Sequence, residues 1–319
     1  MKNFELDPLF HEYAVLVINK LQSDELLPTF SEYAQFLVDR VKSMPDWQIA
    51  LPVITCLAAG GSLGDGITLA SAWVSLNLAS EILDNVEDNE LMTDQFLISP
   101  EVASNLSTGL IFSSFHTLTT IQDAGKASQI ARIFSGSGFD AANGQHRDLL
   151  QARLPVELHL NNYWEIIILK SGSVFRAATE GGAAAAGANE TIAEALGDYG
   201  TALGVILQLM DDCRDAFNHS QEAINWEISL PLLLYLMTVG EENIIFPKVS
   251  SQAEYSDLLQ KTQVIHAISA LLLQWKSRAL ESLSPLPQSR EKLILERIPS
   301  LFLERIPSIT NEVIDENHT

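Results

Sequence analysis

The sequence has little cysteine, little positive charge and no long uninterrupted apolar run. Only two of its 319 residues are cysteines, Cys56 and Cys213, and their spacing is not that of a metal site. A disulfide framework is therefore not expected, and a reducing cytoplasm is the expected location. The N-terminus lacks the basic start and apolar run of a signal peptide. No apolar run reaches the roughly 18 residues of a membrane-spanning helix, so none is predicted.

Basic residues are scarce, because 19 lysines and arginines stand against 41 aspartates and glutamates, giving a formal net charge of −22. Such a chain is not expected to bind nucleic acid or an anionic membrane surface, since both would repel it. The same charge would oppose the binding of a diphosphate. If the substrate carries that group, metal ions must supply much of the attraction.

Strand-like alternation of apolar and polar residues is absent, whereas helical periodicity recurs along the chain. The apolar fraction of 47% is ample for a large core. Linkers are short, and no shift in composition marks a domain boundary. We therefore predict an all-α fold, a large helical bundle that forms a single domain over residues 1–319, of which about 1–25 and 305–319 are peripheral or mobile.

The periodicity also predicts where the helices lie. They are expected at residues 10–20, 31–41, 47–59, 65–91, 103–121, 126–153, 158–178, 191–217, 230–239, 258–283 and 288–302. The sequence Gly136-Ser137-Gly138 predicts an interruption near the start of the helix at 126–153. Pro299 lies in the first of two copies of the sequence LERIPS and is not expected to continue a helix.

One stripe of the expected helix at 191–217 carries small and acidic residues. With 3.6 residues per turn, this stripe consists of Gly200, Gly204, Gln208, Asp211 and Asp215, with Asp212 beside it. Clustered carboxylates repel one another unless a proton or a cation lies between them. Mg²⁺ prefers such hard oxygen ligands and commonly bridges to substrate phosphates, so this stripe predicts a Mg²⁺ site at the mouth of a cavity.

A second acidic segment, SEILDNVED, lies more than a hundred residues earlier. Its Asp84 and Asp88 are four residues apart and share a helix face with Asn77 and Glu81. On its own this spacing is more typical of a solvated helix face. Two such helices facing each other could instead hold a cluster of Mg²⁺ ions that stabilises a departing diphosphate.

Four segments together resemble the trans-isoprenyl diphosphate synthases. Residues 196–215, LGDYGTALGVILQLMDDCRD, resemble the second aspartate-rich region of that family. Residues 79–88, ASEILDNVED, resemble the first, with Asn85 where the family has a second aspartate. Residues 144–150, GQHRDLL, resemble its GQxxDL segment, and 170–175, KSGSVF, resemble the segment whose lysine contacts the diphosphate.

The resemblance implies an isoprenoid-synthase-type bundle around a central apolar cavity, and a homodimer. It implies a cluster of Mg²⁺ ions held by five carboxylates, Asp84, Asp88, Asp211, Asp212 and Asp215. Lys170 would bind the diphosphate of an allylic prenyl substrate, while Gln208 and Asn85 would line the substrate site. Gln145 and Asp148, three apart on one helix face, are either a buried polar pair between helices or direct contacts of the substrate.

The departures from the family concern its basic groups. Residues 43–52, SMPDWQIALP, stand where chain-elongating members have a GGKR-type segment, and their only cationic neighbour is Lys42. Residues 89–95, NELMTDQ, have no arginine where those members have two, and Glu227 replaces a lysine before the TLP-like residues 229–231. Since those groups normally hold isopentenyl diphosphate, the pattern resembles the ComQ-type peptide-pheromone prenyltransferases, whose acceptor is a peptide side chain.

The leading hypothesis is therefore a Mg²⁺-dependent prenyltransferase that ionises a geranyl- or farnesyl-class diphosphate and transfers the prenyl group to an acceptor other than isopentenyl diphosphate. Three alternatives remain. A class I terpene cyclase would capture the cation with its own double bonds. A conventional polyprenyl diphosphate synthase would use isopentenyl diphosphate. A regulatory subunit would have no need of Asp211, Asp212 and Asp215.

Overall fold

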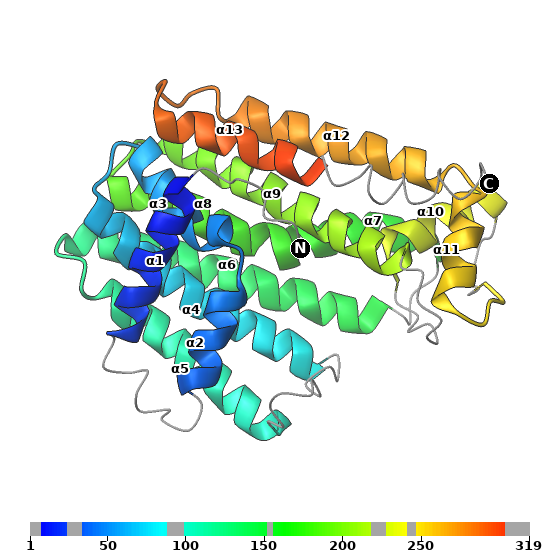
Figure 1. Ribbon diagram of the computed structural model, residues 1–319, viewed down its shortest axis with the longest axis horizontal. Helices are drawn as coiled ribbons and strands as arrows, with labels where there is room; N and C mark the ends of the chain where they lie inside the picture. Colours follow the sequence, from blue (N-terminus) through cyan, green and yellow to red (C-terminus); the bar gives the residue numbers. More distant parts are fainter. Residues whose placement is uncertain are drawn as a thin grey trace. The chain divides into compact units, whose positions relative to one another are not determined.

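The structure is a computed structural model that describes residues 8–23, 34–87, 99–151, 156–217, 228–240 and 247–303. Within those ranges the regular structure is entirely helical (Figure 1), as the periodicity predicts. Three sequence features lie outside the described residues: Asp88, Glu227 and most of the second LERIPS copy.

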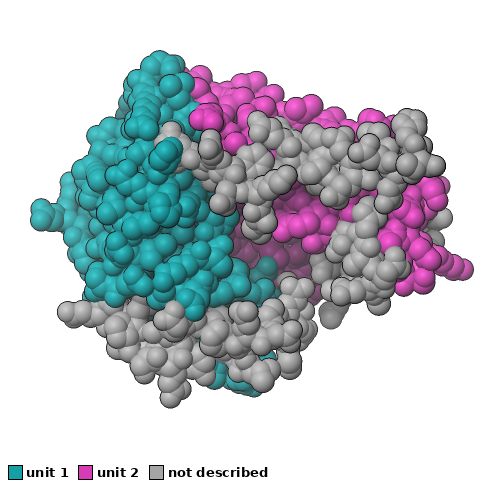
Figure 2. Space-filling model, in the orientation of Figure 1, with its two compact units in different colours: residues 1–137, 176–197, 285–295 teal, residues 138–175, 198–284, 296–319 magenta. Residues whose placement is uncertain are grey.

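The chain divides into two compact units, coloured separately in Figure 2. Unit 1 comprises residues 1–137, 176–197 and 285–295, and unit 2 comprises 138–175, 198–284 and 296–319. Four helices contribute residues to both units: α6 (Ala124–Gln151), α8 (Ser173–Ala186), α9 (Glu190–Ala216) and α13 (Arg290–Leu303). The prediction of a single domain stays a prediction.

Unit 1 is organised around α4 (Leu63–Glu87), which contacts four other helices. These are α1 (Pro8–Gln22), α2 (Ala34–Ser43), α3 (Asp46–Ala58) and α5 (Pro100–Leu118). The α4 sequence is apolar or small on most sides, and its Trp73 is fully buried. A helix that is apolar all round must be covered by neighbours, which explains its central place. Helix α1 buries Phe10, Ala14 and Val17, so this part of the N-terminal stretch belongs to the core.

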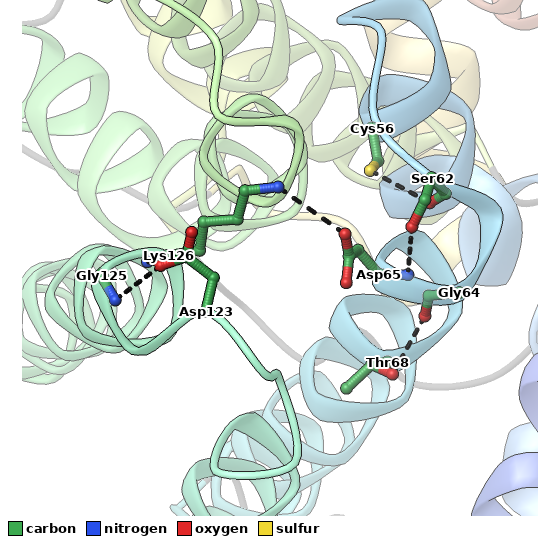
Figure 3. A network of polar contacts seen from close by, with 8 residues as sticks. All are labelled: Cys56, Ser62, Gly64, Asp65, Thr68, Asp123, Gly125 and Lys126. Carbon is green, nitrogen blue, oxygen red and sulfur yellow. Dashed lines mark hydrogen bonds and ion pairs between the residues drawn. The ribbon is translucent and has the colours of Figure 1, made fainter.

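The beginning of α4 is fixed by short polar contacts, which Figure 3 shows. The Ser62 hydroxyl accepts a hydrogen bond from the Asp65 amide at 3.1 Å, which satisfies one of the free donors of the first turn. Asp123 does the same for α6 through the amides of Gly125 and Lys126. The Lys126 ammonium lies 3.7 Å from the Asp65 carboxylate and so links the two helix beginnings.

Among the described residues, α4 is also the one helix long and apolar enough to cross a membrane by length and composition. In its most apolar window, 61% of the residues are buried inside the protein. A buried core helix has the same length and composition. The contacts of α4 with α1, α2, α3 and α5 account for its apolar character.

Unit 2 contains α7 (Val156–Ile167), α10 (Leu230–Val239), α11 (Gln252–Gln260) and α12 (Val264–Ser282), together with its parts of the shared helices. Helix α10 packs on α7 and α12, and α11 packs on α12. Between α7 and α8 the chain forms a π-helical turn, η2 (Ile168–Gly172). Short π-helical turns within helices are frequently found at functional sites.

Three expectations about the helices were wrong. Helix α6 runs without interruption through Gly136 and Gly138, where an added Cβ would meet no atom within 4 Å, so these glycines face open space. The helix expected at 258–283 is two helices, α11 and α12. Pro299 lies inside α13, which forgoes one backbone hydrogen bond there.

Candidate active site

The π-helical turn η2 places Lys170, the lysine expected to bind diphosphate, between two neighbouring helices of unit 2. A Cβ added to Gly144 of α6 would lie 2.6 Å from the Lys170 backbone nitrogen. A Cβ added to Gly204 of α9 would lie 2.3 Å from the Ser171 carbonyl oxygen. Only glycine permits these approaches, so glycines from two of the four family-like segments hold the turn that carries Lys170.

The Lys170 side chain points toward the GQHRDLL segment. Its ammonium nitrogen lies 3.5 Å from an Asp148 carboxylate oxygen, and the two side chains are 24% and 34% exposed. The pair therefore links η2 to α6 while it remains open to solvent. This is the geometry of a cation held in place without being buried.

Gln145, one turn before Asp148, has a buried side-chain amide. Neither its nitrogen nor its oxygen has a hydrogen-bond partner among the described residues. Buried polar groups are nearly always satisfied, so an unmet donor and acceptor beside a lysine–carboxylate pair indicate a place for a polar ligand or bound water. The direct contact between Gln145 and substrate stays a prediction.

The three aspartates of the DDCRD segment, at the end of α9, differ in solvent exposure. Asp211 and Asp215 are exposed, and Asp211 forms an ion pair with Arg214. The end of the helix is fixed from α11, because the Gln252 amide donates to the backbone carbonyls of Asp215 and, at 3.3 Å, of Ala216. The two exposed carboxylates thus stand one turn apart on a fixed helix end.

Asp212, by contrast, is 9% exposed. One of its carboxylate oxygens accepts a hydrogen bond from the Gln208 amide nitrogen at 3.0 Å. The other accepts from the Tyr163 hydroxyl at 2.7 Å and from the Leu230 backbone amide at 3.0 Å. Protein donors from α7, α9 and α10 therefore bind both oxygens of this carboxylate.

The electrostatics of this cluster follow from its burial. Burial raises the pKa of Asp212, and the donors Gln208, Leu230 and Tyr163 oppose that rise because they favour the ionised form. Burial, and secondly the neighbouring Asp212, hold the pKa of Tyr163 well above its ordinary value. The phenol therefore stays protonated and acts as a donor. Burial also raises the pKa of Cys213 to about 12, so this thiol is inert.

Gln208 was expected to line the substrate site, and the structure shows both ends of its amide in use. The nitrogen donates to Asp212, and the oxygen accepts from the Ser171 hydroxyl at 2.8 Å. Ser171 belongs to η2, next to Lys170. Gln208 consequently connects the lysine-bearing turn with the acidic end of α9.

The first acidic segment belongs to unit 1. Asp84 and Asn85 are both half-buried near the end of α4, and Asp88 lies outside the described residues. One turn before Asp84, Glu81 forms an ion pair with Arg40 of α2, and both side chains are partly exposed. The structure thus brings a cation to the helix face that carries this segment.

Arg40, Tyr163 and Ser171 were not among the residues that the sequence singled out. For Tyr163 a signal existed: it falls on the buried face of α7 with Ile166 and Ile167, and a buried phenol usually finds a polar partner. For Arg40 no such signal existed, since only the packing of α2 on α4 brings it to Glu81.

Two of the expected Mg²⁺ ligands, Asp211 and Asp215, are exposed at the end of α9. No group of three or more His, Cys, Asp or Glu side chains among the described residues is close enough to hold a metal ion. Mg²⁺ does not need such a group, because it usually keeps several waters and binds through one or two carboxylates together with substrate phosphates. Exposed Asp211 and Asp215 fit that requirement.

A small apolar hollow lies within unit 1, and α4, the helix that carries Asp84, forms part of its wall. Its lining comes from α1, α2, α4 and α5 and consists of Ile18, Leu21, Gln22, Leu37, Val38, Val41, Val74, Ser75, Leu78 and Leu110.

Comparisons with known proteins agree with this picture. A family model described as "Polyprenyl synthetase" matches residues 66–225, a range that includes all four family-like segments. A short chain isoprenyl diphosphate synthase of Methanocaldococcus jannaschii is 26% identical over 137 residues, which are 42% of this chain and 41% of that protein. The chain spans about half the length of the curated relatives it matches.

Solved structures resemble the chain over more of its length. A geranylgeranyl pyrophosphate synthetase from Geoglobus acetivorans has a TM-score of 0.79 at 17% identity, over 94% of this chain and 99% of that one. A polyprenyl synthase from Caulobacter crescentus, complexed with calcium and isoprenyl diphosphate, has a TM-score of 0.74 at 20% identity, over 92% and 94%. At these identities the likeness shows the fold, and it confirms the predicted isoprenoid-synthase-type bundle.

Proposed function

The chain belongs to the polyprenyl synthetase family, and from that premise we propose that it is a Mg²⁺-dependent prenyltransferase that ionises an allylic prenyl diphosphate. One observation carries the proposal: α9 bears both the glycine that fixes the turn of Lys170 and the exposed carboxylates Asp211 and Asp215. A single helix thus positions a cation for a diphosphate and ligands for the ions that would accompany it.

In this proposal Lys170 binds the diphosphate, held by Asp148 until substrate arrives, and Gln145 offers its unpaired amide to the same ligand. Asp211 and Asp215 of α9 would hold Mg²⁺, because both are exposed. Asp84 and Asp88 stay the further Mg²⁺ ligands that the family resemblance implies. When bound, Mg²⁺ supplies Lewis-acid stabilisation of the negative charge that develops on the leaving group.

The C–O bond of the allylic diphosphate breaks and both of its electrons leave with the diphosphate, which leaves an allylic cation. A π-bond of the acceptor supplies the electron pair of the new C–C bond, and the acceptor then loses a proton to a base. Lys170 contributes by keeping the departing diphosphate in place.

The names of the relatives favour a prenyl diphosphate as the product, and isopentenyl diphosphate is the acceptor that would give one. The M. jannaschii protein is described as a short chain isoprenyl diphosphate synthase, and a Methanosarcina mazei relative as a geranylfarnesyl diphosphate synthase. We accordingly place chain elongation first among the reactions to be tested, ahead of the peptide acceptor that the sequence pattern suggested.

An acceptor without a diphosphate is the second candidate, and a specific observation favours it. The stretch 43–52 has no basic residue, the stretch 89–95 has none either, and the formal charge is −22. A second anionic substrate would find few cations there. A peptide side chain would not need them.

Product analysis separates these reactions. The purified chain would be incubated with geranyl or farnesyl diphosphate and Mg²⁺, with isopentenyl diphosphate, with a tryptophan-containing peptide, or with no acceptor. A longer prenyl diphosphate establishes elongation, a prenylated peptide establishes the second candidate, and a terpene hydrocarbon formed without acceptor establishes a cyclase. No consumption of any allylic diphosphate in Mg²⁺ would contradict the proposed function, and consumption that survives Asp211→Ala would contradict the assigned site.

We also propose a homodimer, which the family resemblance implies, and a cytoplasmic location. Light scattering on the eluted protein measures the mass directly, and a mass of 35.1 kDa would contradict the dimer.

A further inference from the structure

A continuous path of hydrogen bonds runs through unit 2 behind the exposed carboxylates. It starts at the Tyr163 hydroxyl of α7, passes through the Asp212 carboxylate and the Gln208 amide of α9, and ends at the Ser171 hydroxyl of η2. The Leu230 amide, the first residue of α10, also donates to Asp212. The path thus connects four elements through one buried carboxylate.

The geometry assigns different tasks to the neighbouring aspartates. Asp212 is 9% exposed and accepts three hydrogen bonds, so its oxygens are already bound by protein donors. Asp211 and Asp215 are exposed. A carboxylate that must bind a hydrated Mg²⁺ needs an accessible oxygen, which only the outer two provide.

We propose that Tyr163 and Asp212 are positioning residues, which hold the acidic end of α9, the beginning of α10 and the lysine-bearing turn η2 in a fixed relation, and that Asp212 is not itself a Mg²⁺ ligand. This inference rests on the proposed function, since it concerns how the chain's own residues hold the Mg²⁺–diphosphate site. It assigns a role to a tyrosine that the sequence did not single out.

The Tyr163 hydroxyl and the Asp212 carboxyl group depend on each other through their hydrogen bond. Without the phenol, the buried Asp212 carboxyl group loses one of its three donors, and the end of α9 is less well fixed against α7. Groups that orient metal ligands typically affect metal affinity or activity by about 10- to 100-fold when they are removed. We expect Tyr163→Phe to weaken Mg²⁺ binding by that factor. The substitution removes only the hydroxyl, because the ring and its edge-on contact with Trp164 at 5.5 Å remain.

The matched control is Tyr199→Phe. Tyr199 is another buried tyrosine, on α9 itself, but it lies more than three turns from Asp212, beyond the reach of a phenol. Both variants lose one buried hydroxyl, so a general effect of that loss would appear in both. Thermal unfolding of the Mg²⁺-free proteins measures this general effect for each.

The test measures how many Mg²⁺ ions each protein binds, and how tightly, by equilibrium dialysis with inorganic diphosphate. We expect Tyr163→Phe and Asp212→Asn to bind the wild-type number of ions with about 10- to 100-fold weaker affinity. Asp211→Asn should bind fewer ions, and Tyr199→Phe should equal the wild type. The Tyr163→Phe/Asp212→Asn double variant should be no weaker than the weaker single variant, because the two residues act as one unit.

Three results would overturn the inference. They are a reduced number of ions in Asp212→Asn, wild-type affinity in Tyr163→Phe, and effects of the two substitutions that simply add. A wild-type chain that binds no Mg²⁺ with diphosphate and consumes no allylic diphosphate would instead contradict the proposed function, and this inference with it.

Discussion

The two acidic segments have the same spacing but differ at their second position. In unit 2 that position is Asp212, buried and bound by three protein donors, while Asp211 and Asp215 on either side are exposed. In unit 1 it is Asn85, half-buried next to half-buried Asp84. From sequence alone the asparagine reads as a lost metal ligand. We propose that Asp212 at this position binds protein donors rather than the metal. On the same reasoning, Asn85 need not weaken the first segment.

The largest expected effect is the loss of turnover when one outer aspartate of either segment is replaced. Asp84→Ala and Asp211→Ala should each lower turnover of an allylic diphosphate by at least about a hundredfold, the lower end of the loss for one group that stabilises developing charge. Steady-state rates over a range of Mg²⁺ concentrations measure it. If Asp84→Ala kept wild-type turnover while Asp211→Ala lost it, the two segments would not be equivalent and only unit 2 would carry the metal site.

The second prediction concerns the glycines that hold η2. Gly204→Ala should lower the free energy of unfolding by about 3 kcal/mol, the upper end for overpacking, because its Cβ would lie 2.3 Å from a backbone oxygen. Its control is Gly136→Ala on α6, where nothing lies within 4 Å of the added Cβ. Since alanine favours a helix over glycine, that variant should gain about 0.5–1 kcal/mol. Urea unfolding measures both, and equal effects would contradict the close packing described for η2.

Much of the fold follows from local sequence, because a 3.6-residue period and short linkers leave an all-α bundle as the main solution. The packing of η2 does not. GQHRDLL, KSGSVF and the α9 glycines are recognisable as separate segments, but only the structure shows that Gly144 and Gly204 press on the same turn. A π-helical turn adds one residue to a helix without leaving a periodicity signal. The sequence therefore predicted one continuous helix at 158–178, where the structure has η2.

The candidate site divides in the same way. Asp211, Asp215 and Lys170 could be selected by residue type and spacing, since they are charged groups that stay accessible. The burial and hydrogen bonding of Asp212 could not be predicted, because its donors come from α7 and α10 as well as from α9. Contacts between elements distant in sequence are set by tertiary packing, which periodicity does not encode.

A smaller effect is expected for the ion pair next to the first segment. Arg40→Ala should lower the free energy of unfolding by about 0.5 kcal/mol, because an ion pair between partly exposed side chains contributes little. Thermal unfolding at low and high salt measures it, with Lys42→Ala as the neighbouring control. A loss well above that of the control, unchanged by salt, would show that Arg40 does more than pair with Glu81.

The smallest expected effect concerns the second position of the first acidic segment, where the two segments differ. If the second position of an acidic segment does not bind the metal, Asn85→Asp should leave turnover within about twofold of the wild type, which is about 0.5 kcal/mol in activation free energy. Rates at saturating Mg²⁺ measure it. A large gain in turnover would show that the first segment lacks a metal ligand at this position after all.

Release of inorganic diphosphate from farnesyl diphosphate, followed as Mg²⁺ is titrated, is the most direct test of the central claim. We expect release that saturates with Mg²⁺, that stops with a chelator, and that is lost in Asp211→Ala but retained in Tyr199→Phe. Release that is independent of Mg²⁺, or that persists in Asp211→Ala, would contradict it.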